Sequence, residues 1–144
     1  MLVYGTANPV GYGNADYTGI YLTNGDIQKI TPEMMGVPVK IEHKGADVGK
    51  VVSSWVHNGR MELLLDIDGQ NIESQFGREF VKRGMCKDLS LGYKVQMSRS
   101  SETGMLCATN KRVVEVSLVK VGAREDCHIH GWDSNVKPSH HIVI

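Results

Sequence analysis

The stretch that decides the fold is DVGKVVSSWVHNGRMELLLDID, residues 47–68. Two runs of alternating character flank Asn58 and Gly59, two residue types that tolerate the positive φ of a tight turn. In the second run, every second residue is apolar, and the residues between them form a second series that begins with Arg60 and Glu62. The stretch therefore predicts a β-hairpin whose second strand has one buried face, formed by Met61, Leu63, Leu65 and Ile67.

Alternating segments on both sides of the hairpin predict further strands. VPVKIEH, residues 37–43, places His43 at the end of an apolar face. DLSLGYKVQM, residues 88–97, and MLCATNKRVVEVSLVKVG, residues 105–122, are two long strands joined by a polar loop. YTGIYL, residues 17–22, is a short strand candidate, whereas the Gly-rich opening and the tail GWDSNVKPSHHIVI have no clear pattern.

Two segments carry helical signals. ITPEMMG, residues 30–36, has a Thr-Pro start and a glycine end, which predicts one or two helical turns capped by Thr31. NIESQFGREFVKRGM, residues 71–85, repeats an apolar residue every four positions after Asn71, which can cap a helix. The second segment is the more convincing helix.

Length and composition predict a single domain over residues 1–144, with a tail from about 133 to 144. The chain is near the modal domain size, and 41% of its residues are hydrophobic. Several closely spaced strands around one clear helix predict a mainly β fold with a few helices. We expect a closed or nearly closed antiparallel β-barrel covered by helices.

Charge and targeting signals narrow the class of protein. Sixteen basic residues balance sixteen acidic residues, so no excess of Lys and Arg favours nucleic acid or an anionic membrane as a partner. No apolar run approaches the length of a membrane span, and the N-terminal residues lack the order of a signal peptide. We expect an intracellular protein that is not secreted. Three widely spaced cysteines, Cys86, Cys107 and Cys127, favour reduced thiols.

Three polar residues interrupt faces that are otherwise apolar: His43, Ser90 and Glu115. Burying such groups costs about 1–3 kcal/mol each unless they are hydrogen-bonded, so we expect them to bond one another. A linked hydroxyl, imidazole and carboxylate form an activated nucleophile, and Gly92 would leave room above Ser90 for substrate. Such trios also arise by chance in a chain with six histidines, so the pattern alone leaves a structural role open.

Longer segments resemble a known superfamily. They are GVPVKIEHKGADVGKVVSS, a following hairpin and helix, LSLGYKV, and KRVVEVSLVKVGARE. These segments are similar, in type and in their order along the chain, to segments of the viral assembly proteases. That superfamily comprises the phage prohead proteases and the herpesvirus assemblins. The similarity runs from about Gly36 to about Arg124. It implies an assemblin-like fold and a serine endopeptidase.

The resemblance implies a role for each member of the trio. His43 follows the first hydrophobic strand and precedes V-G-K-V, which is the place of the general base. Ser90 lies in the L-S-x-G pattern of the nucleophile. Glu115 lies in E-V-S-L-V, the phage form of the third position, where herpesvirus enzymes have a second histidine.

A loop for the oxyanion is implied in the same way. VGAR, residues 121–124, resembles the herpesvirus segment V-G-R-R, so Gly122 belongs to this loop. Ala123 would contribute a backbone N–H and Arg124 a side chain. Ala123 replaces one arginine of that segment, and Lys44 stands where phage members commonly have an acidic residue, so a phage or eukaryotic-virus origin stays open.

The resemblance implies an enzyme of viral capsid maturation that works without a cofactor or metal. Its substrates would be scaffold and capsid-precursor proteins inside assembling procapsids of the infected host, and it would act as a homodimer. A catalytically inactive scaffold or capsid component of the same fold is the alternative. A third hypothesis is a metal-dependent hydrolase that would use the C-terminal histidines, which are His128, His130, His140 and His141. These histidines do not provide a third metal ligand at the spacing of a zinc motif.

Overall fold

The structure is a computed structural model that describes residues 1–8, 22–99, 101–104, 106–124 and 126–133, with residues 106–109 described by their backbone alone. The strand expected at residues 17–22 lies outside these residues except for Leu22. The elements are, in order, β1 (Leu2–Asn8), α1 (Asn24–Ile30), the 3₁₀ helix η2 (Thr31–Glu33), β2 (Pro38–Ile41), β3 (Lys44–His57), β4 (Arg60–Asp66), α2 (Ile72–Lys82), β5 (Asp88–Arg99), β6 (Leu106–Val119) and β7 (Ile129–Asp133).

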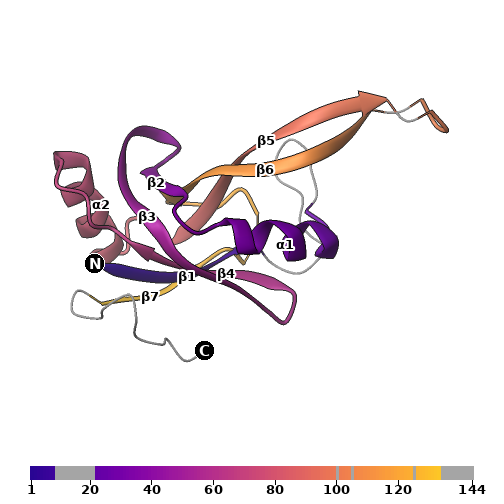
Figure 1. The fold of residues 1–144 in the computed structure, drawn as a ribbon. Helices are drawn as coiled ribbons and strands as arrows, with labels where there is room; N and C mark the ends of the chain where they lie inside the picture. Colours follow the sequence, from indigo (N-terminus) through magenta and orange to yellow (C-terminus); the bar gives the residue numbers. More distant parts are fainter. Residues whose placement is uncertain (9–21, 100, 105, 125, 134–144) are drawn as a thin grey trace.

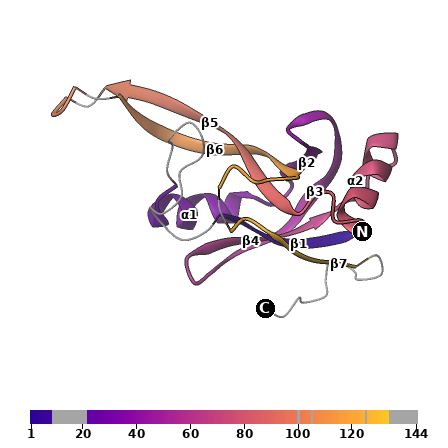
Figure 2. The ribbon, with the colours of Figure 1, turned by 180° about the vertical axis from the view of Figure 1, so that it is seen from behind.

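The strands form one mixed sheet of seven strands, in the order β5-β6-β2-β3-β4-β1-β7 (Figures 1 and 2). The prediction of a mainly β chain with a few helices is therefore confirmed. Neighbouring strands are antiparallel except for β2 and β6, which are parallel, so the prediction of a purely antiparallel sheet is wrong at this pair. The described strands do not close into a barrel, because β5 and β7 remain the two edges of the sheet.

The two edges nevertheless approach each other at the beginning of β5. Leu89 N donates a hydrogen bond to Cys127 O at 2.7 Å, and Ile129 N donates to Lys87 O at 2.8 Å. Between these bonds, Asp88 and His128 form an isolated antiparallel bridge. The segment before β7 is therefore attached to β5 immediately before Ser90.

The predicted hairpin is present as β3 and β4. Asn58 and Gly59 have φ values of 51° and 76°, as its tight turn requires. The four apolar residues of the predicted inner face are fully buried in the main core. Glu62 and Leu64, on the opposite face, are also buried, because β1 contributes Leu2 and Tyr4 to a second, smaller apolar cluster there.

The helix predicted after Asn71 is confirmed as α2. Asn71 caps it by accepting a hydrogen bond from Ser74 N at 2.7 Å, and Gly84 follows it with a φ of 68°. Of the predicted apolar stripe, Phe80 packs against the core, whereas Ile72 and Phe76 are 65% and 50% exposed. Small residues allow the closer contact instead, and Gly77 lies against Ile41 and Leu118.

The helical segment around Thr31 begins earlier than predicted. Thr23 caps α1 through a capping box with Asp26, and Thr31 stands at the C-terminal end of α1, where it also opens η2. The prediction of Thr31 as the first cap is therefore wrong. The preceding residues NGDIQK form a helix despite their polarity, because Ile27 and Ile30 supply a buried face.

The outer halves of β5 and β6 project as a long hairpin away from the remaining elements (Figure 1). Their inner halves lie in the body of the sheet, where Leu89 pairs with Leu118 and Leu91 with Val116 in the core. The polar residues of both strands lie on the opposite face of this inner part. In the described part of the chain, no helix combines the length and the apolar character needed to cross a membrane.

The cysteines allow a chemical test of this core. Cys86 and Cys127 are buried free thiols, and the Cys107 side chain lies outside the described residues. Burial raises the pKa of Cys127 to about 12. Burial, with a contribution from the Glu42 carboxylate, raises the pKa of Cys86 to about 11.

Because the thiolate is the reactive form, we expect iodoacetamide at about pH 8 to leave Cys86 and Cys127 unmodified in the folded protein and to alkylate both after unfolding. Peptide mapping by mass spectrometry measures this. Alkylation of either residue at the rate of a free thiol, without unfolding, would contradict the burial described above.

Candidate active site

The three polar residues expected to bond one another do so. Ser90 lies on β5, Glu115 on β6 and His43 in the turn between β2 and β3. His43 Nε2 is 2.9 Å from Ser90 Oγ, and His43 Nδ1 is hydrogen-bonded to Glu115 Oε1. A hydroxyl, an imidazole and a carboxylate linked in this order can form a nucleophile, its general base and the acid that orients the base.

The turn that carries His43 has an unusual backbone. β2 ends at Ile41, so the prediction that His43 belongs to this strand is wrong. Glu42 and His43 have φ values of 51° and 60°, a conformation that costs side-chain-bearing residues about 1–3 kcal/mol each. Hydrogen bonds from Glu42 N to Leu118 O at 3.0 Å and from His43 N to Ser117 Oγ at 2.9 Å hold the turn against β6.

Ser117 is a site residue that the sequence analysis missed. Its hydroxyl donates to Glu115 Oε2 at 2.7 Å and accepts from His43 N, so it fixes both the acid and the segment that carries the base. The side chain is fully buried and lies opposite Ser90 in the β5–β6 ladder. Its two-residue spacing from Glu115 is the signal that could have identified it, because residues i and i+2 share one face of a strand.

Gly92 has a different role from the one expected. It pairs directly with Glu115 across the ladder, and a Cβ atom at this position would collide with the Glu115 carboxylate. The missing side chain therefore makes room for the acid of the trio, whereas the prediction was room for substrate above Ser90.

We expect Gly92→Ala to push Glu115 away from His43 and to lower the activity of the trio by roughly ten- to a thousandfold, with a loss of stability of about 1–3 kcal/mol from overpacking. The rate of labelling by a fluorophosphonate and the thermal midpoint measure the two effects. Gly131→Ala is the matched control, because this strand glycine has open space around it and should tolerate a methyl group. Normal reactivity of Gly92→Ala would mean that Glu115 can move without consequence.

Exposure differs across the trio. Ser90 and Glu115 are only 5% and 8% exposed, whereas the side chain of His43 is 40% exposed. Both carboxylate oxygens of Glu115 have partners, His43 and Ser117, as a buried charge requires. The imidazole thus lies between a buried acid and solvent, so the trio is exposed to solvent on the side of His43.

The predicted oxyanion loop runs along β5. Gly122 N donates to Asp88 Oδ2 at 2.8 Å, and a Cβ atom on Gly122 would approach Leu89 O to 3.1 Å. Arg124 is buried, and its guanidinium donates to the Tyr93 hydroxyl at 3.0 Å. The loop therefore contacts β5 before Ser90, through Asp88 and Leu89, and after it, through Tyr93.

The C-terminal histidines have other partners. His128 Nδ1 is 2.7 Å from Asp88 Oδ1, and His130 Nε2 is 2.7 Å from Thr6 Oγ1, which in turn bonds Glu62. Among the residues that the structure describes, no cluster of His, Cys, Asp or Glu is suited to a metal ion. His140 and His141 lie outside the described residues.

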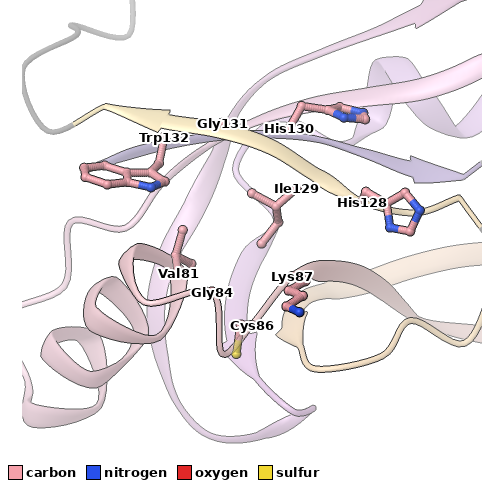
Figure 3. A pocket seen from close by; sticks show the side chains of 9 residues that line it. All are labelled: Val81, Gly84, Cys86, Lys87, His128, Ile129, His130, Gly131 and Trp132. Atoms are coloured by element: carbon pink, nitrogen blue, oxygen red, sulfur yellow. The ribbon is translucent and has the colours of Figure 1, made fainter.

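A cavity of about 620 Å³ lies between the C-terminal end of α2 and β7 (Figure 3). Val81, Ile129 and Trp132 give it apolar walls, and Lys87 and His128 lie on the side of β5. The trio is not part of its lining. The cavity is therefore separate from the trio, although His128 in its lining also bonds Asp88.

A scan against models of protein families finds no match to this chain, and a search of curated proteins finds no relative.

Proposed function

We propose that the protein is a serine endopeptidase with a Ser-His-Glu triad. The observation that carries this proposal is the hydrogen-bonded chain of Ser90, His43 and Glu115, whose members come from three separate segments. Ser117 and Gly92 support the same arrangement, because one bonds the acid and the other leaves space for it.

In this mechanism, Ser90 Oγ attacks the carbonyl carbon of the scissile peptide bond while His43 Nε2 accepts its proton. Glu115 accepts a hydrogen bond from His43 Nδ1–H, which selects the reactive tautomer and stabilises the imidazolium. His43 then donates the proton to the leaving amine, and an acyl-enzyme on Ser90 remains. A water molecule, deprotonated by His43, hydrolyses this ester and restores the Ser90 hydroxyl.

The negative charge of the tetrahedral intermediates needs donors close to Ser90. We assign this role to the loop Gly122–Arg124. The resemblance implies the N–H of Ala123 as the backbone donor, and the neighbouring N–H of Gly122 already donates to Asp88. Arg124, which bonds Tyr93 on the strand of Ser90, adds positive charge behind it.

The substrate class comes from the resemblance to the viral assembly proteases. We assign scaffold and capsid-precursor proteins as substrates, cleaved within assembling procapsids of the infected cell by an assemblin-like homodimer that needs no cofactor. The parallel contact of β2 with β6, and the contact of β5 with the segment before β7, support a barrel-like arrangement around the triad.

A fluorophosphonate probe tests the proposal. We expect it to label the folded protein at Ser90, mapped by mass spectrometry, and not to label heat-denatured protein. Ser54→Ala is a matched control, because the Ser54 hydroxyl only donates to the Thr31 carbonyl at 2.6 Å and should be irrelevant to labelling. Labelling of a different serine would contradict the triad. Complete absence of labelling would favour the alternative, an inactive scaffold or capsid component of the same fold.

A further inference from the structure

Asp88 connects the strand of the nucleophile with the loop after β6. One carboxylate oxygen accepts the hydrogen bond of Gly122 N at 2.8 Å, and the other lies 2.7 Å from His128 Nδ1. The side chain of Asp88 is 15% exposed, so solvent competes little for these bonds. Asp88 also shares one face of β5 with Ser90, two residues further along.

The backbone on both sides of Asp88 is fixed as well. Lys87 O accepts from Ile129 N at 2.8 Å, and Leu89 N donates to Cys127 O at 2.7 Å. The carboxylate therefore projects from a rigid position. Its distance to Gly122 then determines where the following N–H, that of Ala123, lies relative to Ser90.

A second carboxylate acts on the same loop from the side of the base. Glu42 Oε1 accepts a hydrogen bond from Lys120 N at 2.8 Å, and Glu42 directly precedes His43 in the chain. Two N–H groups of the segment after β6, those of Lys120 and Gly122, are thus held by carboxylates, each close in sequence to a member of the triad. Glu42 is exposed, so its bond is the weaker of the two.

We infer that Asp88 is a positioning residue for the oxyanion loop, with Glu42 as a weaker second support. This inference rests on the proposed function. Hydrogen bonds to charged groups contribute about 1.5–3 kcal/mol, more than those between neutral groups. The hydrogen bonds of the Asp88 carboxylate go to Gly122 and His128 and not to the triad side chains. Its effect on the reaction is therefore transmitted through the loop.

The test compares Asp88→Ala with Asp88→Asn. Alanine removes the acceptor, whereas asparagine keeps an oxygen that can accept from Gly122 N. Because an oxyanion donor stabilises the transition state more than it stabilises bound substrate, its displacement affects kcat more than KM. We therefore expect Asp88→Ala to lower kcat by roughly 10- to 100-fold, with KM within roughly threefold of wild type. Asp88→Asn should keep most of kcat. A merely structural role would not give this split or this rescue.

Asp126→Asn is the matched control for charge. Its carboxylate lies 3.8 Å from the other ring nitrogen of His128, and its side chain is 69% exposed. We expect kcat to stay at the wild-type value. Glu42→Ala should give a smaller loss than Asp88→Ala, in the same direction.

Amide hydrogen exchange at Gly122 reads the hydrogen bond without using activity. We expect exchange to be at least roughly tenfold faster in Asp88→Ala than in wild type and close to wild type in Asp88→Asn. If exchange at Gly122 differs among the three proteins as expected but wild type does not react with fluorophosphonate, the proposed function fails and the positioning of the loop stands. Unchanged exchange at Gly122 in Asp88→Ala, or an unchanged kcat in an active enzyme, overturns the inference.

Discussion

Ser90→Ala is expected to abolish both fluorophosphonate labelling and peptide cleavage, with kcat reduced by about 10⁴- to 10⁶-fold. No other described group can form the acyl-enzyme at this position, so only the rate enhancement from binding and the oxyanion loop would remain. The fold should persist, because the substitution removes only the hydrogen bond between the Ser90 hydroxyl and His43 and leaves the backbone ladder with β6 intact. Digestion of a proteome-derived peptide library, read by mass spectrometry, measures the loss and defines the cleavage motif.

His43→Ala should reduce kcat to a similar level, because the nucleophile and its base act as a unit. The double variant should therefore be hardly worse than either single variant. Ser54→Ala serves as the control for the loss of a hydroxyl from the sheet. If Ser90→Ala still cleaves the library like wild type, the triad is not the catalytic group.

Glu115→Ala is expected to lower activity by roughly ten- to a thousandfold and to remain above Ser90→Ala. Glu115 selects the tautomer of His43 and stabilises its charged form, and an orienting acid can cost less on removal than the nucleophile or the base. We expect Glu115→His to retain more activity than Glu115→Ala, because the herpesvirus enzymes in the resemblance have a histidine at the corresponding position. The pH dependence of kcat/KM, compared among the three proteins, measures the effect.

The environment of Glu115 makes a control necessary. Removing this buried side chain also leaves the Ser117 hydroxyl without its acceptor, so the thermal midpoint of each variant has to be measured. Ser117→Ala is the companion variant, because it keeps the acid and removes the Ser117 hydroxyl, which bonds both Glu115 Oε2 and His43 N. Its loss of activity is the upper limit of what the Ser117 hydroxyl contributes to the effect of Glu115→Ala. If Glu115→Ala folds normally and keeps near-wild-type activity, Glu115 is a structural residue and the enzyme works as a Ser-His dyad.

Local patterns in the sequence were sufficient for several elements. The β3–β4 hairpin follows from alternation around Asn58 and Gly59, and α2 follows from its period and the cap at Asn71. Each of these signals lies within a few residues, so no knowledge of distant parts of the chain is needed.

β1 was missed for a physical reason. All seven residues of LVYGTAN are buried, because one face of this strand joins the main core and the other joins the smaller cluster around Tyr4. A strand buried on both faces has no alternation of apolar and polar residues to detect. β7 is short, and its last three residues belong to the tail that has no clear pattern in the sequence.

The sequence by itself determined the three polar residues of the trio, since Ser90 and Glu115 interrupt apolar strands and His43 ends an apolar face. Only the tertiary structure decided that they meet, because the parallel pairing of β2 with β6 brings the His43 turn beside Glu115, and the β5–β6 ladder brings Ser90 there. It also decided the contacts of Ser117, Gly92 and Asp88. A strand's period is a property of neighbouring residues, whereas strand partners are distant in the chain, and hydrogen bonds between side chains depend on which strands become partners.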